Sequence, residues 1–430
     1  RRERARAAEM LLAEPRTALP LLLARLRSQR SIHRQTAAIL LGALADPRAE
    51  APLVETALSE DFLAGGHARQ ALVKLYASLP PDALGERVAG RLPGTIADAP
   101  RAAEARALIA ASACEAVHRI YGQEEAPALP AALEALLRDA VARQSPDVRR
   151  AAAGALGLSG EKSAAAALLA RLDEETAPGV LAALCRAVAR IRPVAGGDKL
   201  LPLAEHADKR VQLEAIAALY GLGYGRTLPR IAAFLEDSSQ SLRVRAVEIL
   251  GDLRDPAALK ALGKAARDVS WVVRLEAVRA FGKMERPGVT GVLRLLLQDE
   301  HPRVRAEAAV LLDRMQVPGA VWALIDDLAS DETAYRIAAA RAAGRIRASR
   351  AVRALGSAVH AEDLELACSA AEALGAIGER RGAEELLAAG RDPRPALQDA
   401  ARRALQAIFG SDPGPDTEAW PAWAEAQERE

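Results

Sequence analysis

The stretch DVSWVVRLEAVRAFGKM, residues 268–284, decides the fold because its arrangement recurs at a fixed step of 31 residues. Arg274 lies six residues after Asp268, and Gly282 follows eight residues after Arg274. Four columns share the step: Gly251, Gly282, Gly344 and Gly375, with Asp313 in the remaining slot; Arg243, Arg274, Arg305 and Arg336; Ala246, Ala277, Ala308, Ala339 and Ala370; and Leu262, Leu293, Leu324, Leu355 and Leu386. Columns in register over five units indicate a repeat protein.

Each unit is predicted to form two helices. Between residues 237 and 268 the apolar residues recur at steps of three and four, which is the spacing of one buried helical stripe. Gly251 is predicted to end the first helix, because glycine tolerates a left-handed turn. Pro256 is predicted to open the second helix, where a missing amide donor costs nothing. Leu262 then continues the apolar stripe.

A two-helix unit cannot bury its stripe alone, so neighbouring units must stack on a shared core. The sequence therefore predicts an all-α solenoid of about 12 to 13 two-helix repeats. We expect less regular repeats over residues 1–144 and regular 31-residue repeats over 145–409. Residues 410–430 are expected to form a C-terminal tail in which Trp420 and Trp423 cap the last repeat, a docking peptide being the alternative.

The repeat pattern resembles that of the HEAT-repeat family, in particular the short bacterial HEAT-like units also found in phycobilin lyases. The matching features are an aspartate six residues before an arginine, a Val or Leu just before that arginine, then alanine, and then Leu-Gly. The resemblance implies a ladder of polar contacts along the stack, formed by Asp237, Arg243, Asp268, Arg274, Asp299, Arg305 and Arg336. We expect each aspartate to cap the helix that follows it and to accept a hydrogen bond from the arginine in that helix's first turn.

Composition narrows the range of functions. Lys+Arg 58 against Asp+Glu 57 leaves a formal net charge of +1, which argues against general nucleic-acid binding. The three cysteines, Cys114, Cys185 and Cys368, are far apart and form no CxxC pair, so neither a disulfide framework nor a structural zinc site is expected. The longest strongly apolar uncharged stretch, residues 36–45, is too short for a membrane span.

The chain starts with RRERARAAEMLL rather than with methionine. We expect it to be a fragment or a processed product, so a preceding signal or anchor is not visible in it. The cysteine usage favours a cytoplasmic location, and a periplasmic or membrane-anchored form stays open.

The sequence offers no catalytic, cofactor or metal site. None of the six histidines is followed by glutamate, so the His-Glu pairs with which HEAT-like deoxyhypusine hydroxylases hold iron are absent from the sequence. Cys114 and His118 lie four residues apart, but two ligands do not make a zinc site. The segment GLGYG, residues 221–225, follows a predicted helix and is interpreted as an inter-helix turn rather than a phosphate loop.

A basic column is the most suggestive surface feature. Lys283, Arg314 and Arg345 follow the glycine slot at steps of 31, with Arg279 and Arg341 one helical turn before two of them. Stacked repeats would present these cations as a row along one edge. The row either contacts an acidic partner segment or an anionic polymer, or complements the dipoles at the helix C-termini.

The favoured function is a non-catalytic scaffold, without a cofactor, whose curved inner surface and edges bind another protein, either alone or within a larger complex. The alternatives are a bilin lyase or isomerase, which should bind a tetrapyrrole and shift its absorption, and a nucleic-acid binder, which should lose affinity steeply with salt. A HEAT-like DNA glycosylase is disfavoured by the near-zero net charge.

Overall fold

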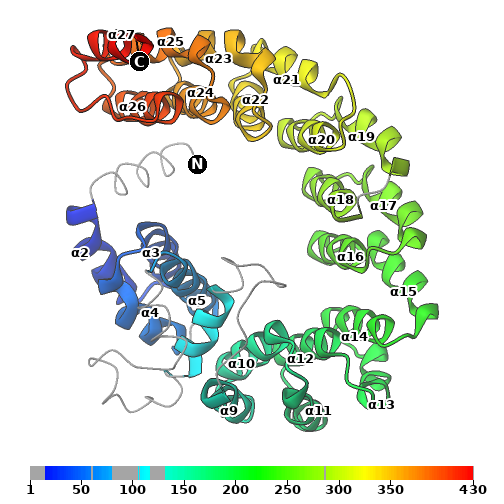
Figure 1. The fold of residues 1–430 in the computed structure, drawn as a ribbon. Coiled ribbons are helices and arrows are strands. Elements are labelled where there is room, and N and C mark those ends of the chain that lie inside the picture. Colours follow the sequence, from blue (N-terminus) through cyan, green and yellow to red (C-terminus); the bar gives the residue numbers. More distant parts are fainter. Residues whose placement is uncertain are drawn as a thin grey trace. The chain divides into compact units, whose positions relative to one another are not determined.

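The computed structural model describes residues 15–59, 62–79, 105, 107–116, 131–284 and 287–429. These residues form α-helices and short 3-10 helices, with no strand among them. The chain divides into two compact units, Arg1–Arg230 (unit 1) and Ile231–Glu430 (unit 2). The all-α fold expected from the repeat pattern is confirmed, whereas the repeat number and the boundaries at residues 144 and 409 stay predictions (Figure 1).

The described helices of unit 1 are α2 (Pro15–Leu26), α3 (Ser31–Leu44), η1 (Pro47–Ala49), α4 (Glu50–Ala57), α5 (Phe62–Ala77), α9 (Ala131–Ala140), α10 (Pro146–Ser159), η2 (Lys162–Ala164), α11 (Ala165–Glu174), α12 (Pro178–Ile191), α13 (Gly196–Leu200), η3 (Pro202–Glu205), α14 (Lys209–Gly221) and η4 (Gly225–Thr227). Helix α15 (Leu228–Ala233) contains the boundary between the units.

The described helices of unit 2 are η5 (Phe234–Glu236), α16 (Gln240–Leu253), η6 (Pro256–Ala258), α17 (Leu259–Ala265), α18 (Trp271–Met284), η7 (Pro287–Val289), α19 (Thr290–Leu296), α20 (Pro302–Arg314), α21 (Ala320–Leu328), α22 (Thr333–Arg345), η8 (Ser349–Ala351), α23 (Val352–Val359), α24 (Leu364–Ile377), η9 (Arg380–Gly382), α25 (Ala383–Ala389), α26 (Pro395–Phe409) and α27 (Trp420–Arg429).

Unit 2 consists of two layers of helices. The longer first helices of successive repeats, α16 to α26 in even numbers, form one layer, and the shorter odd-numbered second helices form the other (Figure 1). A 3-10 turn joins the two helices in several repeats: Asp255 accepts a hydrogen bond from the amide of Ala257 at 2.7 Å, and Pro256 starts the turn η6. The proline thus opens a 3-10 turn that leads into α17.

The core lies between the two layers. The leucine column contributes one side chain from each second helix, and all five leucines, from Leu262 to Leu386, are at most 1% exposed. The alanine column of the first helices, from Ala246 to Ala370, is fully buried. Positions 31 residues apart therefore have equivalent surroundings in unit 2, as expected of stacked repeats.

The glycine column has a different role from the predicted one. Gly251 does not end α16; the helix continues to Leu253, and Arg254 adopts the left-handed conformation with φ 51°. Gly251 is buried inside the helix, where a Cβ would lie 2.7 Å from the Cβ of Ala280 in α18. Gly375 meets Ala404 in the same way. Gly251, Gly344 and Gly375 are therefore contact points that let adjacent first helices approach closely.

Substitution of Gly375 by valine should lower the stability of unit 2 by about 1–3 kcal/mol, because the new Cβ would lie 2.7 Å from the Cα of Ala404 and the backbone would have to shift. Gly263 in α17 is the control. Nothing lies within 4 Å of a Cβ added there, so Gly263→Ala should be neutral or stabilising. Urea unfolding of both variants measures the difference, and equal midpoints would disprove the close contact.

Helix α27 covers the C-terminal end of unit 2. Trp420 is 1% exposed and belongs to the same core cluster as Leu386 and Leu405. Its indole Nε1 donates to the carbonyl of Gly414 at 3.0 Å. Trp423 packs edge-on against Phe409, with ring centroids 5.2 Å apart. The two tryptophans thus contact the last repeat rather than pointing away from it.

No described helix is both long and apolar enough to span a bilayer.

Candidate functional site

The ladder residues of unit 2 connect successive repeats. The Arg243 guanidinium donates to both carboxylate oxygens of Asp268, at 2.7 and 2.9 Å, and Arg274 does the same to Asp299. Each aspartate also accepts from a backbone amide of the next helix start, as Asp268 does from Ser270 at 2.8 Å. The carboxylate partner of Arg243 and of Arg274 is therefore the aspartate 25 residues later, and the expected side-chain pairing within one helix start is wrong for both.

The arginine still contacts the aspartate six residues before it, but through the backbone. Arg243 donates to the carbonyl oxygen of Asp237 at 3.0 Å, and Arg274 to that of Asp268 at 2.7 Å. This explains the spacing of six, because a first-turn arginine reaches back over the loop that precedes its own helix. Each guanidinium thus ties the loop of its own repeat to the loop of the next.

The ladder changes at Arg305. Arg305 pairs with Asp327, which lies inside α21, and its guanidinium carbon lies 4.2 Å from the centroid of the Tyr335 ring. The Arg336 Nε is buried and has no hydrogen-bond partner among the described residues. Residue 361, which is 25 positions later, is alanine, so the carboxylate that the earlier arginines contact is missing from this repeat.

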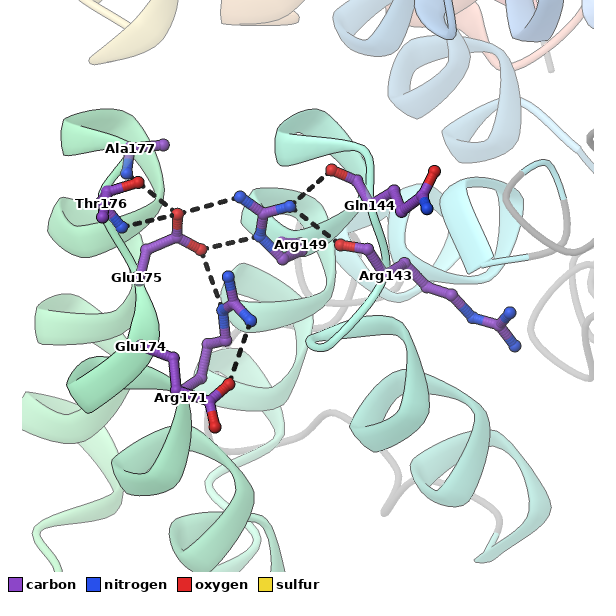
Figure 2. A network of polar contacts seen from close by, with 8 residues as sticks. All are labelled: Arg143, Gln144, Arg149, Arg171, Glu174, Glu175, Thr176 and Ala177. Atoms are coloured by element: carbon purple, nitrogen blue, oxygen red, sulfur yellow. Dashed lines mark hydrogen bonds and ion pairs between the residues drawn. The ribbon is translucent and has the colours of Figure 1, made fainter.

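Unit 1 contains an equivalent of the ladder that the periodicity did not identify. Arg149 donates to both carboxylate oxygens of Glu175, at 2.7 and 2.9 Å, and to the carbonyls of Arg143 and Gln144 (Figure 2). Burial by itself would raise the pKa of Glu175. Hydrogen bonds from Arg149, the Ala177 amide and Arg171 outweigh burial and lower the pKa of Glu175 to about 2.

Each cation of the basic row has a partner within unit 2. Lys283 pairs with Asp252 at 2.7 Å, Arg341 with Glu365 at 2.9 Å, and Arg345 with Glu307 at 2.7 Å. Arg279 pairs with Glu276 at 3.2 Å, and Arg314 donates to the carbonyl of Gly282 at 2.7 Å. Arg314 therefore contacts a carbonyl near a helix C-terminus, as the dipole alternative for the basic row expects. The carbonyl belongs to the neighbouring helix α18, however, and not to the helix of Arg314 itself.

Two adjoining hollows lie against these same cations, on helices α18, α20 and α22. One measures about 650 Å³ and the other about 320 Å³, and they share Arg279, Glu307 and Arg345. Together we call them the basic groove. Seven cations line it, against two carboxylates: Arg254, Arg279, Lys283, Arg303, Arg314, Arg341 and Arg345, with Glu307 and Glu365.

The basic groove lies where the close glycine contact is lost. Elsewhere in unit 2 a glycine meets an alanine 29 residues later, as Gly251 meets Ala280 and Gly344 meets Ala373. Between α18 and α20 the alanine slot holds Leu311, and in α20 the glycine slot holds Asp313. A larger side chain at either slot prevents the closest approach of two helices. The basic groove therefore coincides with two substitutions in otherwise regular columns.

Aromatic rings form one end of the basic groove. The rings of Trp271 and His301 stack in parallel, with centroids 3.8 Å apart. His301 Nδ1 accepts from the Arg303 amide at 3.3 Å, and burial, followed by the charge of Arg303, lowers the pKa of the His301 ring. The Arg303 side chain is exposed, lies 6.0 Å from the Trp271 centroid and forms no ion pair with a described residue.

The sequence-based search missed Arg254, Arg303, Trp271 and His301 as groove residues. Arg303 and Trp271 belong to no basic column, so no step of 31 points to them. Arg254 lies three residues after a glycine slot, outside the column that was followed.

Burial disfavours the thiolate form of the three cysteines. Cys114 and Cys185 are buried, and burial raises the pKa of each thiol to about 12; burial also raises the pKa of Cys368. His118 lies outside the described residues. Within the described ranges no three His, Cys, Asp or Glu side chains are grouped so that they could hold a metal ion. Residues 221–225 connect α14 to η4, as the turn interpretation of GLGYG requires.

Paired helices stacked at a step of 31, with an arginine-carboxylate ladder, define an α-helical repeat protein. The sequence matches the family described as HEAT repeats over residues 197–272, 259–335 and 321–406, and the PBS lyase HEAT-like repeat over residues 148–174. The chain belongs to the HEAT-repeat family. No curated protein aligns significantly with it.

Solved structures of similar fold share little sequence with this chain. The CpcE–CpcF complex of phycocyanin lyase from Nostoc sp. PCC7120 is 19% identical, covering 69% of this chain and 94% of that one, with a TM-score of 0.35. Human deoxyhypusine hydroxylase is 16% identical over 77% and 96%, with a TM-score of 0.26. Yeast importin-β is 15% identical over 94% and 62%, with a TM-score of 0.43.

Proposed function

We propose that the protein is a non-catalytic scaffold that binds a partner polypeptide along the basic groove of unit 2. The observation that carries this proposal is the groove itself, a hollow of about 650 Å³ continued by one of about 320 Å³, which lies where the glycine and alanine columns of unit 2 hold Asp313 and Leu311. Its stacked aromatic pair and its excess of cations supply an apolar anchor and an electrostatic one.

A polypeptide fits the groove better than a uniformly charged polymer. Glu307 lines both hollows and Glu365 lines the larger one. A nucleic-acid strand would bring phosphates close to both carboxylates, whereas a peptide can place neutral residues there. The overall charge of +1 points in the same direction.

Charge reversal tests the proposal. In the variant Lys283→Glu, Arg314→Glu, Arg345→Glu, the partner that cross-links to the wild-type protein in a lysate of the native organism should be lost, because the groove would repel its acidic groups. The melting temperature should hardly change, because Lys283 and Arg345 form partly exposed pairs that contribute little. Mass spectrometry of the cross-linked fraction is the measurement.

The matched control reverses three exposed cations outside the groove in the same unit: Lys260 and Arg294 in second helices, and Arg267 in the turn after α17. This control variant carries the same net charge as the groove variant but leaves the groove residues unchanged, so it should still bind the partner. If the groove variant captures the partner as well as the wild type does, the groove is not the binding site. A shift in the absorption of a bound tetrapyrrole would favour a bilin lyase. Nucleic-acid binding whose affinity falls steeply with salt would favour a nucleic-acid-binding protein.

A further inference from the structure

We infer that Glu307 is a built-in competitor that occupies the binding position of an acidic residue in the partner segment. This inference rests on the proposed function and specifies both the chemistry of the partner and the control of its affinity. Glu307 belongs to α20, the middle helix of the groove, and it lines both hollows together with Arg279 of α18 and Arg345 of α22.

The contacts of Glu307 are those that a bound carboxylate would make. Its two oxygens accept from the two terminal nitrogens of Arg345, at 2.7 and 3.3 Å. This two-pronged geometry is the preferred way for a guanidinium to bind a carboxylate of any origin. Arg345 is half-exposed, with 55% of its side chain accessible, so a partner can reach it. A partner carboxylate that binds Arg345 through the same two terminal nitrogens must therefore displace Glu307.

The spacing of the cations suits an acidic polypeptide. Lys283, Arg314 and Arg345 occupy equivalent positions on three neighbouring helices. Adjacent packed helices lie about 8–10 Å apart, and an extended chain rises about 3.3 Å per residue. One carboxylate about every third residue would therefore meet one cation per repeat. Exposed Arg303 adds a guanidinium that no described residue neutralises, near the aromatic end.

The probe that tests the inference is a fluorescein-labelled decaglutamate peptide, whose binding is measured by fluorescence anisotropy at low salt. Glu307→Gln removes the competing charge and leaves the side-chain shape, so it should bind the peptide roughly three-fold more tightly than the wild type, the effect expected of an exposed ion pair. Adding Arg345→Gln should abolish this gain, because the released guanidinium is then missing.

Glu384→Gln is the control for net charge. Glu384 is exposed on α25 in the second-helix layer, so its loss should leave peptide affinity unchanged. Circular dichroism should show that all variants retain the wild-type helicity. Equal affinity of Glu307→Gln and the wild type, or an equal gain in Glu384→Gln, would overturn the inference. Tighter binding of decathymidylate than of decaglutamate would also overturn it, because the groove would then prefer nucleic acid.

The two proposals fail in different measurements. If the groove charge reversal still abolishes partner capture while Glu307→Gln binds decaglutamate no better, Glu307 is no competitor and the scaffold function stands. If capture is independent of the groove, the scaffold function at this site is wrong, whatever the peptide does.

Discussion

Arg149→Ala should lower the free energy of unfolding of unit 1 by about 3–5 kcal/mol, the cost of breaking a buried ion pair by removing one partner. Only 9% of the Arg149 side chain and 1% of the Glu175 side chain are exposed. Without the guanidinium, the Glu175 carboxylate keeps only Arg171 and two backbone amides as partners. The carbonyls of Arg143 and Gln144 also lose their donor.

Arg210→Ala provides the matched control. Arg210 also pairs with a carboxylate in unit 1, that of Asp208 at 2.7 Å, but 66% of its side chain is exposed. Solvent screens such a pair, so its loss should cost less than about 1 kcal/mol. Urea unfolding followed by circular dichroism compares the two variants, and hydrogen exchange of α10 and α12 locates the effect. Equal costs would mean that burial adds nothing to the Arg149 pair.

The pH dependence of the free energy of unfolding tests the same Arg149–Glu175 contact. The folded protein holds the pKa of Glu175 at about 2, below the ordinary value of 4.5. A depressed carboxylate pKa stabilises the fold at pH values above the unfolded pKa, and this contribution is lost as the pH falls through the folded pKa. The stability difference between the wild type and Glu175→Gln should therefore be constant near neutral pH and shrink between about pH 5 and pH 2.

The core was predictable because burial repeats with the sequence. The leucine column identified Leu262, Leu293 and their equivalents, since each second helix must direct one side chain towards the layer of first helices. The direction of the ladder was not predictable in this way. A step of 31 shows that Arg243 and Asp268 recur, but not whether the guanidinium turns to its own loop or to the next.

The groove could not be predicted from any single column of the repeat. The glycine column and an alanine column 29 residues later form contacts between different helices, and only the structure shows that Gly251 faces Ala280. Asp313 already stands out in the glycine column of the sequence, and with that pairing known Leu311 stands out as a second exception. Arg303 could not be predicted as a groove residue even then, because it belongs to no column of the repeat.

Leu293→Ala should destabilise unit 2 by about 2–5 kcal/mol, because it removes a fully buried side chain and leaves a cavity. Leu293 lies in α19 and belongs to the leucine column between the two layers. All four tryptophans, Trp271, Trp322, Trp420 and Trp423, lie in unit 2. Their fluorescence during urea unfolding therefore reports on the unit that carries the substitution.

Leu295 of the same helix is the control, because it is 63% exposed and its replacement by alanine should change stability by less than about 0.5 kcal/mol. A repeat in a solenoid contacts only its neighbours, so a cavity beside α19 weakens the contacts of α18 and α20 before those of more distant helices. Hydrogen exchange in Leu293→Ala should accordingly rise first in α18 to α20, the helices adjoining the basic groove. A loss below about 1 kcal/mol would mean that the leucine column is not the main source of core stability.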